Sequence, residues 1–182
     1  TSITAEVEHA SPELKDEVFP VSAKVTFEFP QRGNYAPMKL IWHDGHFKVP
    51  RPEGLDEKRR MPASGAIVFG DKETLMHDSH GARGLRIFPE SRMKAFKIPP
   101  KTIPRVKGGH EGDWIRGCKE GRQPSSNFAE YGGQLTELVL LGVAAQRTPG
   151  VKLYWDAKKG EFKNNPEASK YLHIKYRDGW KL

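Results

Sequence analysis

Hydrophobic and polar side chains alternate along two stretches near the start of the chain, residues 21–30 and 38–47. The apolar positions are Val25, Phe27 and Phe29 in the first stretch and Met38, Leu40 and Trp42 in the second. Because successive side chains of a strand point to opposite sides of the sheet, this period of two predicts strands with one buried face. The pair Asp44-Gly45, which is typical of tight turns, predicts where the second strand ends.

Shorter apolar runs farther along the chain predict more strands, with turn residues between them. Residues 66–78 divide into two strands at Gly70-Asp71-Lys72, and residues 85–88 predict another strand. Residues 151–164 predict a hairpin whose turn falls at Lys158-Lys159-Gly160. Two Pro-rich segments, residues 49–65 and 97–107, predict long loops, which in compact domains commonly serve binding or interfaces.

Two longer segments have the periodicity of helices. Apolar side chains in residues 110–121 fall at i, i+1 and i+4 and predict one narrow buried face. Residues 131–148 are apolar around so much of their circumference that they predict the most buried helix. The narrow face consists of Trp114, Ile115 and Cys118, and the broad stripe of Leu135, Leu138, Val139, Gly142 and Val143, with Ala144 and Ala145 beside it. A short helix is predicted over residues 165–172.

Strands dominate the first half of the chain and helices the second half. This order predicts an α+β fold, in which helices cover one face of an open, largely antiparallel sheet. A length of 182 residues predicts a single domain over residues 1–182. The chain begins without Met and almost directly in a strand-like pattern, so we expect it to be a fragment of a longer protein.

Charge and composition narrow the possible partners. Lys and Arg number 30 against 23 acidic residues, but the basic residues are scattered, and the densest run, residues 94–107, is interrupted by prolines. No nucleic-acid-binding motif accompanies this charge, so no nucleic-acid partner is expected. No apolar segment approaches the roughly 18 residues of a membrane span, and no membrane partner is expected. A single cysteine, Cys118, excludes an internal disulfide and leaves the compartment open.

Motifs that would place catalysis or a cofactor within this chain are missing from the sequence. It contains no G-x-G-x-x-G fingerprint, P-loop or G-x-S-x-G nucleophile elbow, so neither catalytic nor cofactor-binding residues are expected. The stretches "HDGH" (residues 43–46) and "HDSHG" (residues 77–81) lack the spacing of zinc sites. They are interpreted as turn chemistry, and no metal site is expected.

The stretch "GGHEGDW", residues 108–114, raises the question of a site most sharply. Its two carboxylates, Glu111 and Asp113, are explained by a first helical turn, whose dipole favours negative charge. Trp114 is predicted to begin the buried face, which leaves His110 without a helical role. Farther on, Asn127 either caps a helix or points its amide at a ligand.

An ordered set of motifs gives the chain a resemblance to a known family. The set comprises "KLIWHDG", "VPRPEG", "PESRM", "PPKTIPR", "DWIRGCKEGRQPSSNF", "GQLTELVLLGVAAQRT", "LYWDAKKGEF", "NPEASKYL" and "YRDGWKL". Together these motifs cover residues 23–182, which resemble the C-terminal part of bacterial Gfo/Idh/MocA-type oxidoreductases, the family of glucose-fructose oxidoreductase and inositol dehydrogenase.

The resemblance implies a two-domain, NAD- or NADP-dependent parent enzyme that acts on sugars or polyols. In this family an N-terminal Rossmann domain binds the nucleotide, and the helix-covered side of the C-terminal sheet faces the cofactor. The opposite sheet face typically builds the oligomer. Some relatives are glycosidases that oxidise and re-reduce a sugar. Location remains open between the cytoplasm and the periplasm, since no leader is visible in the sequence.

The family's Gly-rich turn, its E-K-P lysine motif and its catalytic histidine would all lie upstream of this chain. The expected role is therefore that of a substrate-side and assembly domain without dehydrogenase activity of its own, since hydride transfer needs a bound nicotinamide. A homo-oligomer through the sheet face is expected. A stand-alone carbohydrate-binding or dimerisation module, a domain of a redox-assisted glycosidase and a basic nucleic-acid binder remain as alternatives.

Five residues are the candidates for contact with a sugar-like molecule, chosen for their chemistry. They are Arg51 in the Pro-rich segment of residues 49–65, Arg92 shortly before that of residues 97–107, His110 and Trp114 at the helix start, and Asn127. Arg, His and Asn can hydrogen-bond to sugar hydroxyls, and Trp can stack on the apolar face of a sugar ring.

Overall fold

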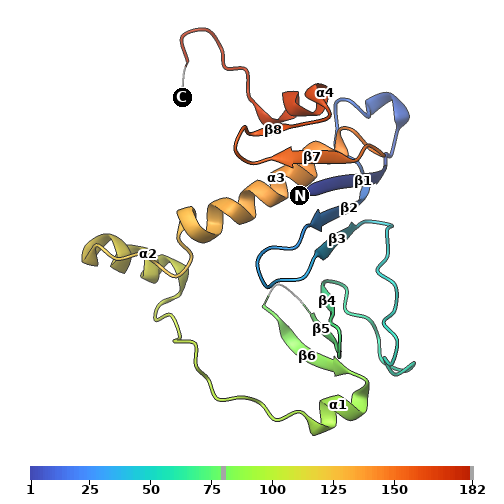
Figure 1. The fold of residues 1–182 in the computed structure, drawn as a ribbon, viewed down its shortest axis with the longest axis vertical. Coiled ribbons are helices and arrows are strands. Elements are labelled where there is room, and N and C mark those ends of the chain that lie inside the picture. Colours follow the sequence, from blue (N-terminus) through green and yellow to red (C-terminus); the bar gives the residue numbers. More distant parts are fainter. Residues whose placement is uncertain (79–80, 181–182) are drawn as a thin grey trace. The chain divides into compact units, whose positions relative to one another are not determined.

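A computed structural model describes residues 1–78 and 81–180 of the chain (Figure 1). The chain divides into two compact units, each with a core of its own. The main unit consists of Thr1–Lys48 and the chain from Val106 onward, and the small unit consists of Val49–Arg105. This division does not test the prediction of a single domain over residues 1–182, which stays a prediction.

A five-stranded antiparallel sheet, with strand order β3-β2-β1-β7-β8, forms the centre of the main unit. Its strands are β1 (Ser2–Glu8), β2 (Ser22–Phe29), β3 (Met38–Asp44), β7 (Leu153–Asp156) and β8 (Glu161–Phe162). Its helices are α2 (Gly109–Glu120), α3 (Gly133–Gln146) and α4 (Pro166–Ser169), with short turns at η1 (Pro12–Leu14), η2 (Phe128–Gly132) and η3 (Lys170–Leu172).

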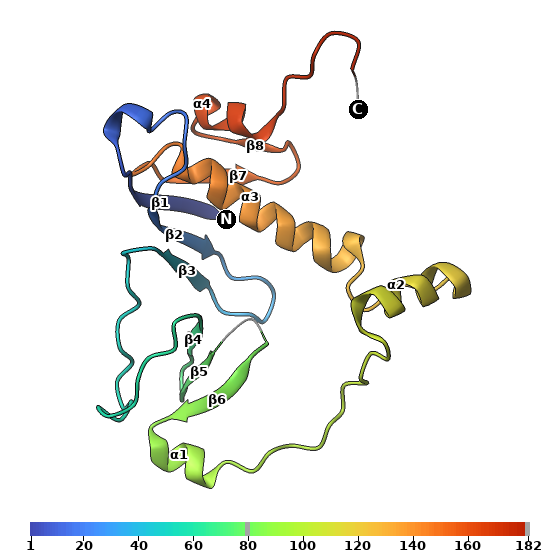
Figure 2. The ribbon, with the colours of Figure 1, turned by 180° about the vertical axis from the view of Figure 1, so that it is seen from behind.

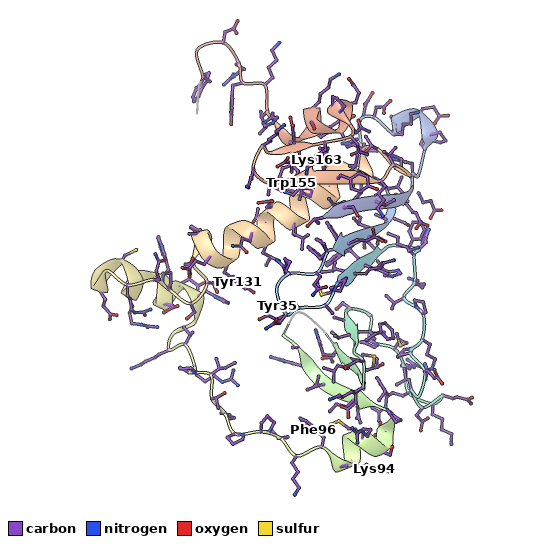
Figure 3. All side chains as sticks on the ribbon, in the orientation of Figure 1. Tyr35, Lys94, Phe96, Tyr131, Trp155 and Lys163 are labelled. Atoms are coloured by element: carbon purple, nitrogen blue, oxygen red, sulfur yellow. The ribbon has the colours of Figure 1, made fainter. Side chains whose placement is uncertain are left out.

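Helix α3 packs across β1 and β2 and closes the core of the main unit (Figures 1 and 2). The buried side chains include Ile3, Ala5, Val25, Phe27, Leu141, Ala144, Ala145, Leu153 and Phe162. The strand register explains this set, because Ile3 pairs with Phe27 and Ala5 with Val25, which brings apolar residues together on the α3 side. Trp155, labelled in Figure 3, contacts Phe162 edge-on at 5.6 Å between ring centroids.

Small residues let α3 approach the sheet closely. A Cβ atom at Gly142 would lie 2.9 Å from Cζ of Phe27 and 3.5 Å from Cγ1 of Val25. The shorter distance is well inside van der Waals contact, so only glycine fits between helix and sheet without a shift of the neighbours.

The sheet face opposite α3 is polar and carries a cluster of ion pairs centred on Glu28. The Glu28 carboxylate lies 2.5 Å from Nζ of Lys152 and 3.2 Å from Nζ of Lys39, and it accepts a hydrogen bond from Oγ of Ser2 at 3.0 Å. The bond with Lys152, followed by those with Ser2 and Lys39, lowers the pKa of Glu28 to about 2. Glu28 thereby connects β2 to β1, to β3 and to the start of β7.

The Glu28 cluster predicts a pH-dependent stability of the main unit. Because the folded pKa of Glu28 is depressed, its contribution is fully present above the ordinary carboxyl range and lost as pH falls toward 2. The variant Glu28→Gln is expected to lower Tm at pH 7 by a few degrees and to show a smaller loss of Tm between pH 5 and pH 2. Calorimetry over this range measures both. The exposed Glu57→Gln is the control and should lower Tm less than Glu28→Gln does.

A three-stranded antiparallel sheet and one helix form the small unit. Its elements are β4 (Gly65–Phe69), β5 (Thr74–Asp78), β6 (Arg83–Phe88) and α1 (Glu90–Ala95). Leu55, Met76 and Phe88 are buried together, with Met61 and Ile67 packed against them. The long Pro-rich loop before β4 thus supplies Leu55 and Met61 to this small core.

The α+β class and the antiparallel strand pairing are confirmed, as are the strands predicted at residues 21–30, 38–47, 66–78, 85–88 and 151–164. The burial predicted for β3 is wrong for Met38 and Trp42, which are exposed. Both side chains lie on the α3 side of the sheet, since Trp42 pairs with Val25, but β3 is an edge strand beyond the strands that α3 covers.

The buried faces predicted for the two long helices also need correction. In α3 the buried residues are Leu141, Gly142, Ala144 and Ala145, whereas Leu135 and Val139 of the predicted stripe are exposed. In α2 the predicted apolar face of Trp114, Ile115 and Cys118 is exposed, and the buried residues are Asp113 and Gly117. Helix α2 therefore buries the polar Asp113 and the small Gly117, and leaves its apolar side chains exposed.

Candidate functional site

Helix α2 and the chain that returns beneath it enclose a pocket of about 700 Å³. Three of the five candidate substrate contacts line this pocket, namely His110, Trp114 and Asn127. The chain enters α2 through Gly108 and Gly109, whose φ angles of +75° and +70° lie in the left-handed region that glycine adopts without strain. This turn places His110 in the first turn of the helix, at the rim of the pocket.

Asp113 ties the returning chain to the helix. Its side chain accepts a hydrogen bond from the backbone N–H of Ser125 at 2.7 Å and one from Nη2 of Arg122 at 2.8 Å. Arg116 adds a longer ion pair at 3.6 Å from the helix itself. Gly117 lies in the same contact, where a Cβ atom would be 3.0 Å from the carbonyl oxygen of Arg122. The helix and the returning chain therefore hold one defined spacing, which sets the width of the pocket.

These bonds also fix the charge of Asp113. The N–H of Ser125, followed by the Arg122 guanidinium, lowers the pKa of Asp113 to about 2, so the group is a carboxylate at every physiological pH. The prediction that Asp113 serves the first-turn dipole is wrong, because α2 begins at Gly109 and Asp113 lies in its second turn. Its partners come from the returning chain, and Glu111 remains as the first-turn carboxylate.

Asn127 caps the π-helical turn Phe128–Gly132. Its Oδ1 accepts a hydrogen bond from the backbone N–H of Glu130 at 2.7 Å, and its Nδ2 donates to the Glu130 carboxylate at 3.3 Å. Between the two interpretations of Asn127, the structure confirms the cap. Asn127 also lines the pocket, next to Phe128 in the sequence.

The walls of the pocket are mainly apolar and include two exposed aromatic side chains. Trp114 is 60% exposed and Phe128 is 82% exposed, and Val106 and Pro124 complete this side. The prediction that Trp114 belongs to the core is wrong, because its ring forms part of an open wall. Apolar walls with a few polar groups at the rim are typical of small-molecule sites.

Arg51 and Arg92 lie in the small unit, where each binds groups of that unit. Nη2 of Arg51 donates to the backbone carbonyls of Asp56 and Arg59, the latter at 2.9 Å, and so closes the loop before β4. Arg92 forms an ion pair with Glu73 at 2.6 Å. Glu73 lines a second, smaller pocket of about 350 Å³. Neither arginine is among the residues that line the larger pocket.

Sequence reasoning missed Arg122 and Phe128. Arg122 follows Asp113 by nine positions, a spacing that no helical or strand period connects, so only the path of the returning chain reveals the pair. Phe128 follows a polar run and has no periodic partner in the sequence.

Two other findings concern metals and membranes. Among residues 1–78 and 81–180, no group of three or more His, Cys, Asp or Glu side chains is arranged to hold a metal ion. Ser79 and His80 of the "HDSHG" stretch lie outside the described residues. In the same described part of the chain, no helix is long and apolar enough to cross a membrane.

Comparison with protein-family models gives no match, and comparisons with curated protein sequences and with solved structures give no significant match.

Proposed function

We propose that this chain is the substrate-side and assembly domain of an NAD- or NADP-dependent oxidoreductase of the Gfo/Idh/MocA type that acts on sugars or polyols. The observation that carries the proposal is the pocket under α2, where His110, Trp114 and Asn127 meet on an apolar wall. The α+β architecture agrees with the C-terminal domain type that the sequence motifs resemble. The proposal therefore rests on a site and on a fold class that are compatible with each other.

The pocket has the chemistry that a sugar or polyol requires. A sugar ring presents C–H groups on its faces and hydroxyl groups around its edge. The exposed rings of Trp114 and Phe128 offer flat apolar surfaces to those faces. His110, Gln123 and Ser126 supply hydrogen-bond donors and acceptors for the hydroxyl groups. Because Asp113 fixes the spacing of helix and returning chain, this surface exists before the ligand binds.

The chain's share of the reaction is to bind and orient the substrate. The nicotinamide, when bound by a Rossmann domain of the parent protein, accepts or donates the hydride. Exposed apolar side chains on α2 and α3, among them Ile115, Leu135 and Val139, are available for contact with a partner domain. Without such a domain the chain is expected to have no dehydrogenase activity.

The polar face of the main sheet is the proposed surface of the homo-oligomer. Its central charges are already paired around Glu28, so a second copy would not leave them uncompensated on contact. The exposed Ile41 and Tyr154 add apolar area to this face.

Ligand titrations test the substrate side of the proposal. With Trp fluorescence as the readout, we expect saturable binding of a hexose or an inositol and no saturable response to NADH or NADPH. Trp114→Ala is expected to weaken sugar binding about tenfold, since it removes the stacking surface. Trp42→Ala is the matched control, because Trp42 is equally exposed at 61% but lies on β3. Tight NADH binding, or equal effects of both variants, would refute this assignment.

The coding sequence upstream of Thr1 tests the parent enzyme. We expect it to encode a strand–turn–helix unit with a G-x-G-x-x-G fingerprint, followed by the E-K-P motif and a histidine-bearing helix. An upstream region without a nucleotide-binding domain would instead favour a stand-alone carbohydrate-binding module.

A further inference from the structure

Residues 94–107 comprise the last two residues of α1 and the extended segment that leads to α2, and no other part of the protein covers them. Every residue from Lys94 to His110 is exposed. Figure 3 labels Lys94 and Phe96 where this segment begins. Three prolines fix its backbone dihedrals and remove N–H donors, so it has little tendency to fold into a helix. We call residues 94–107 the basic strap.

The basic strap combines unpaired positive charge with exposed apolar side chains. Its cations are Lys94, Lys97, Lys101, Arg105 and Lys107, and no acidic residue occurs between Ser91 and His110. Within the described part of the chain, none of these five cations forms an ion pair. Ile98 is 87% exposed and Ile103 is 81% exposed. A fitting partner surface is therefore acidic and has apolar side chains among its acids.

A surface of this kind exists on the main unit, in the loop between β1 and β2. Within residues 13–17, Glu13, Asp16 and Glu17 surround one lysine, and they form no ion pair among the described residues. Leu14 and Val18 beside them are 45% and 46% exposed. We call residues 13–18 the acidic loop.

Arg147 holds the acidic loop in a defined shape at the C-terminal end of α3. Its Nη1 donates to the backbone carbonyls of Lys15, Asp16 and Val18, each at 3.3 Å, and its guanidinium lies 4.1 Å from the centroid of the Phe19 ring. The loop therefore presents its acids and its apolar side chains from a fixed backbone, which lowers the entropy cost of docking.

The three cations proposed for the contact, Lys97, Lys101 and Arg105, belong to the small unit, and the acidic loop belongs to the main unit. The strap enters the main unit at Val106, next to α2, which lies beyond the N-terminal end of α3 (Figure 1). The acidic loop lies at the opposite end of α3, where Arg147 anchors it. Complementary charge on strap and loop, together with exposed apolar side chains on both, is the ground for a contact between two copies of the chain.

We propose that the basic strap docks on the acidic loop of a second copy of this chain. Lys97, Lys101 and Arg105 face Glu13, Asp16 and Glu17 of that copy, and Ile98 and Ile103 contact its Leu14 and Val18. The contact is additional to the sheet-face oligomer and does not depend on the oxidoreductase assignment. Because the charges are exposed, salt weakens the contact.

Two triple charge reversals test the contact. The strap variant carries Lys97→Glu, Lys101→Glu and Arg105→Glu, and the loop variant carries Glu13→Lys, Asp16→Lys and Glu17→Lys. Sedimentation velocity at low salt is expected to show a smaller assembly for each variant than for the wild type, because strap and loop then repel. Circular dichroism checks the fold, which is expected to persist because all six positions are exposed.

Mixing the two variants in equal amounts is the decisive step. In the mixture, the acidic strap of the strap variant can bind the basic loop of the loop variant. The basic strap of the loop variant can likewise bind the acidic loop of the strap variant, so an assembly of wild-type mass should form again. Lys58→Glu, Lys72→Glu and Lys119→Glu together form a control with the same change of net charge as the strap variant, and its assembly should be unchanged. A wild type that is monomeric at low salt, reversals without effect, or a mixture that fails to recover the mass would each overturn the proposal. Recovery in the mixture excludes a contact within one chain and a contact with a different protein.

Discussion

Replacing Gly142 with leucine is expected to destabilise the main unit by about 3 kcal/mol or more. The Cβ alone would lie 2.9 Å from the tip of the Phe27 ring, and the isobutyl group extends farther into the same space. Phe27 cannot move aside easily, since it is 4% exposed and packed between β1, β3 and α3. Helix and sheet must therefore separate, which opens contacts along the whole core. A loss of this size is a large fraction of the 5–15 kcal/mol that stabilises a typical domain.

Gly142→Ala separates overpacking from helix propensity. Alanine favours the helix by about 1 kcal/mol over glycine, but its Cβ meets the same ring atom, so we expect a small net loss of stability. Thr136→Leu, at an exposed position of the same helix, is the matched control and should unfold like the wild type. Urea denaturation followed by far-UV circular dichroism measures all three variants. If Gly142→Leu unfolds at the wild-type midpoint, the close approach of α3 to Phe27 is incorrect.

Sequence patterns predict the strands of this fold well, because a strand with one buried face shows alternating apolar and polar residues in its sequence. Ile3, Ala5, Val25 and Phe27 alternate with polar residues, and this contrast survives in the folded sheet. The same rule fails for Trp42, which occupies an inward position of an edge strand. Alternation predicts which face of the sheet a side chain points to. Whether a helix covers that face at a given strand depends on tertiary structure.

In the helices, the pattern of apolar and polar residues does not distinguish buried positions from exposed ones. Residues 138–145 of α3 are apolar or glycine throughout, so the sequence does not distinguish the buried Leu141 from the exposed Val139. In α2 the apolar side chains of Trp114 and Cys118 line a pocket, whereas the polar Asp113 is buried. His110, Trp114 and Asn127 line one pocket, because the first two lie on α2 and Asn127 lies on the chain that returns beneath it.

Asp113→Asn is expected to open the pocket and to weaken sugar binding about tenfold or more. An amide keeps the size of the side chain, but it loses the ion pair with Arg122 and presents one acceptor oxygen where the carboxylate presents two. The N–H of Ser125 and the Arg122 guanidinium then compete for that oxygen. The returning chain is released from α2, and the wall formed by Pro124 and Phe128 loses its fixed distance from Trp114.

Calorimetry and ligand titration distinguish this local effect from global unfolding. The core under α3 lies in other elements, so Asp113→Asn should keep the cooperative unfolding of the main unit, in contrast to Gly142→Leu. Glu111→Gln, an exposed carboxylate in the first turn of the same helix, is the matched control and should bind sugar like the wild type. Equal affinities of Asp113→Asn and the wild type would show that the ion pair does not shape the pocket.

The pH dependence of the wild type gives a second measure of the same contact. Because the pKa of Asp113 is depressed to about 2, the contact is fully formed above the ordinary aspartate pKa of 3.8 and is lost as pH falls toward 2. Protection of the Ser125 amide from hydrogen exchange should follow this range in the wild type and be weak at all pH values in Asp113→Asn. Since the pKa of Glu28 in the main sheet is lowered to a similar value, protection at Ser125 isolates the contribution of Asp113. A wild-type amide that exchanges freely at pH 7 would mean that the pocket forms only when a ligand closes it.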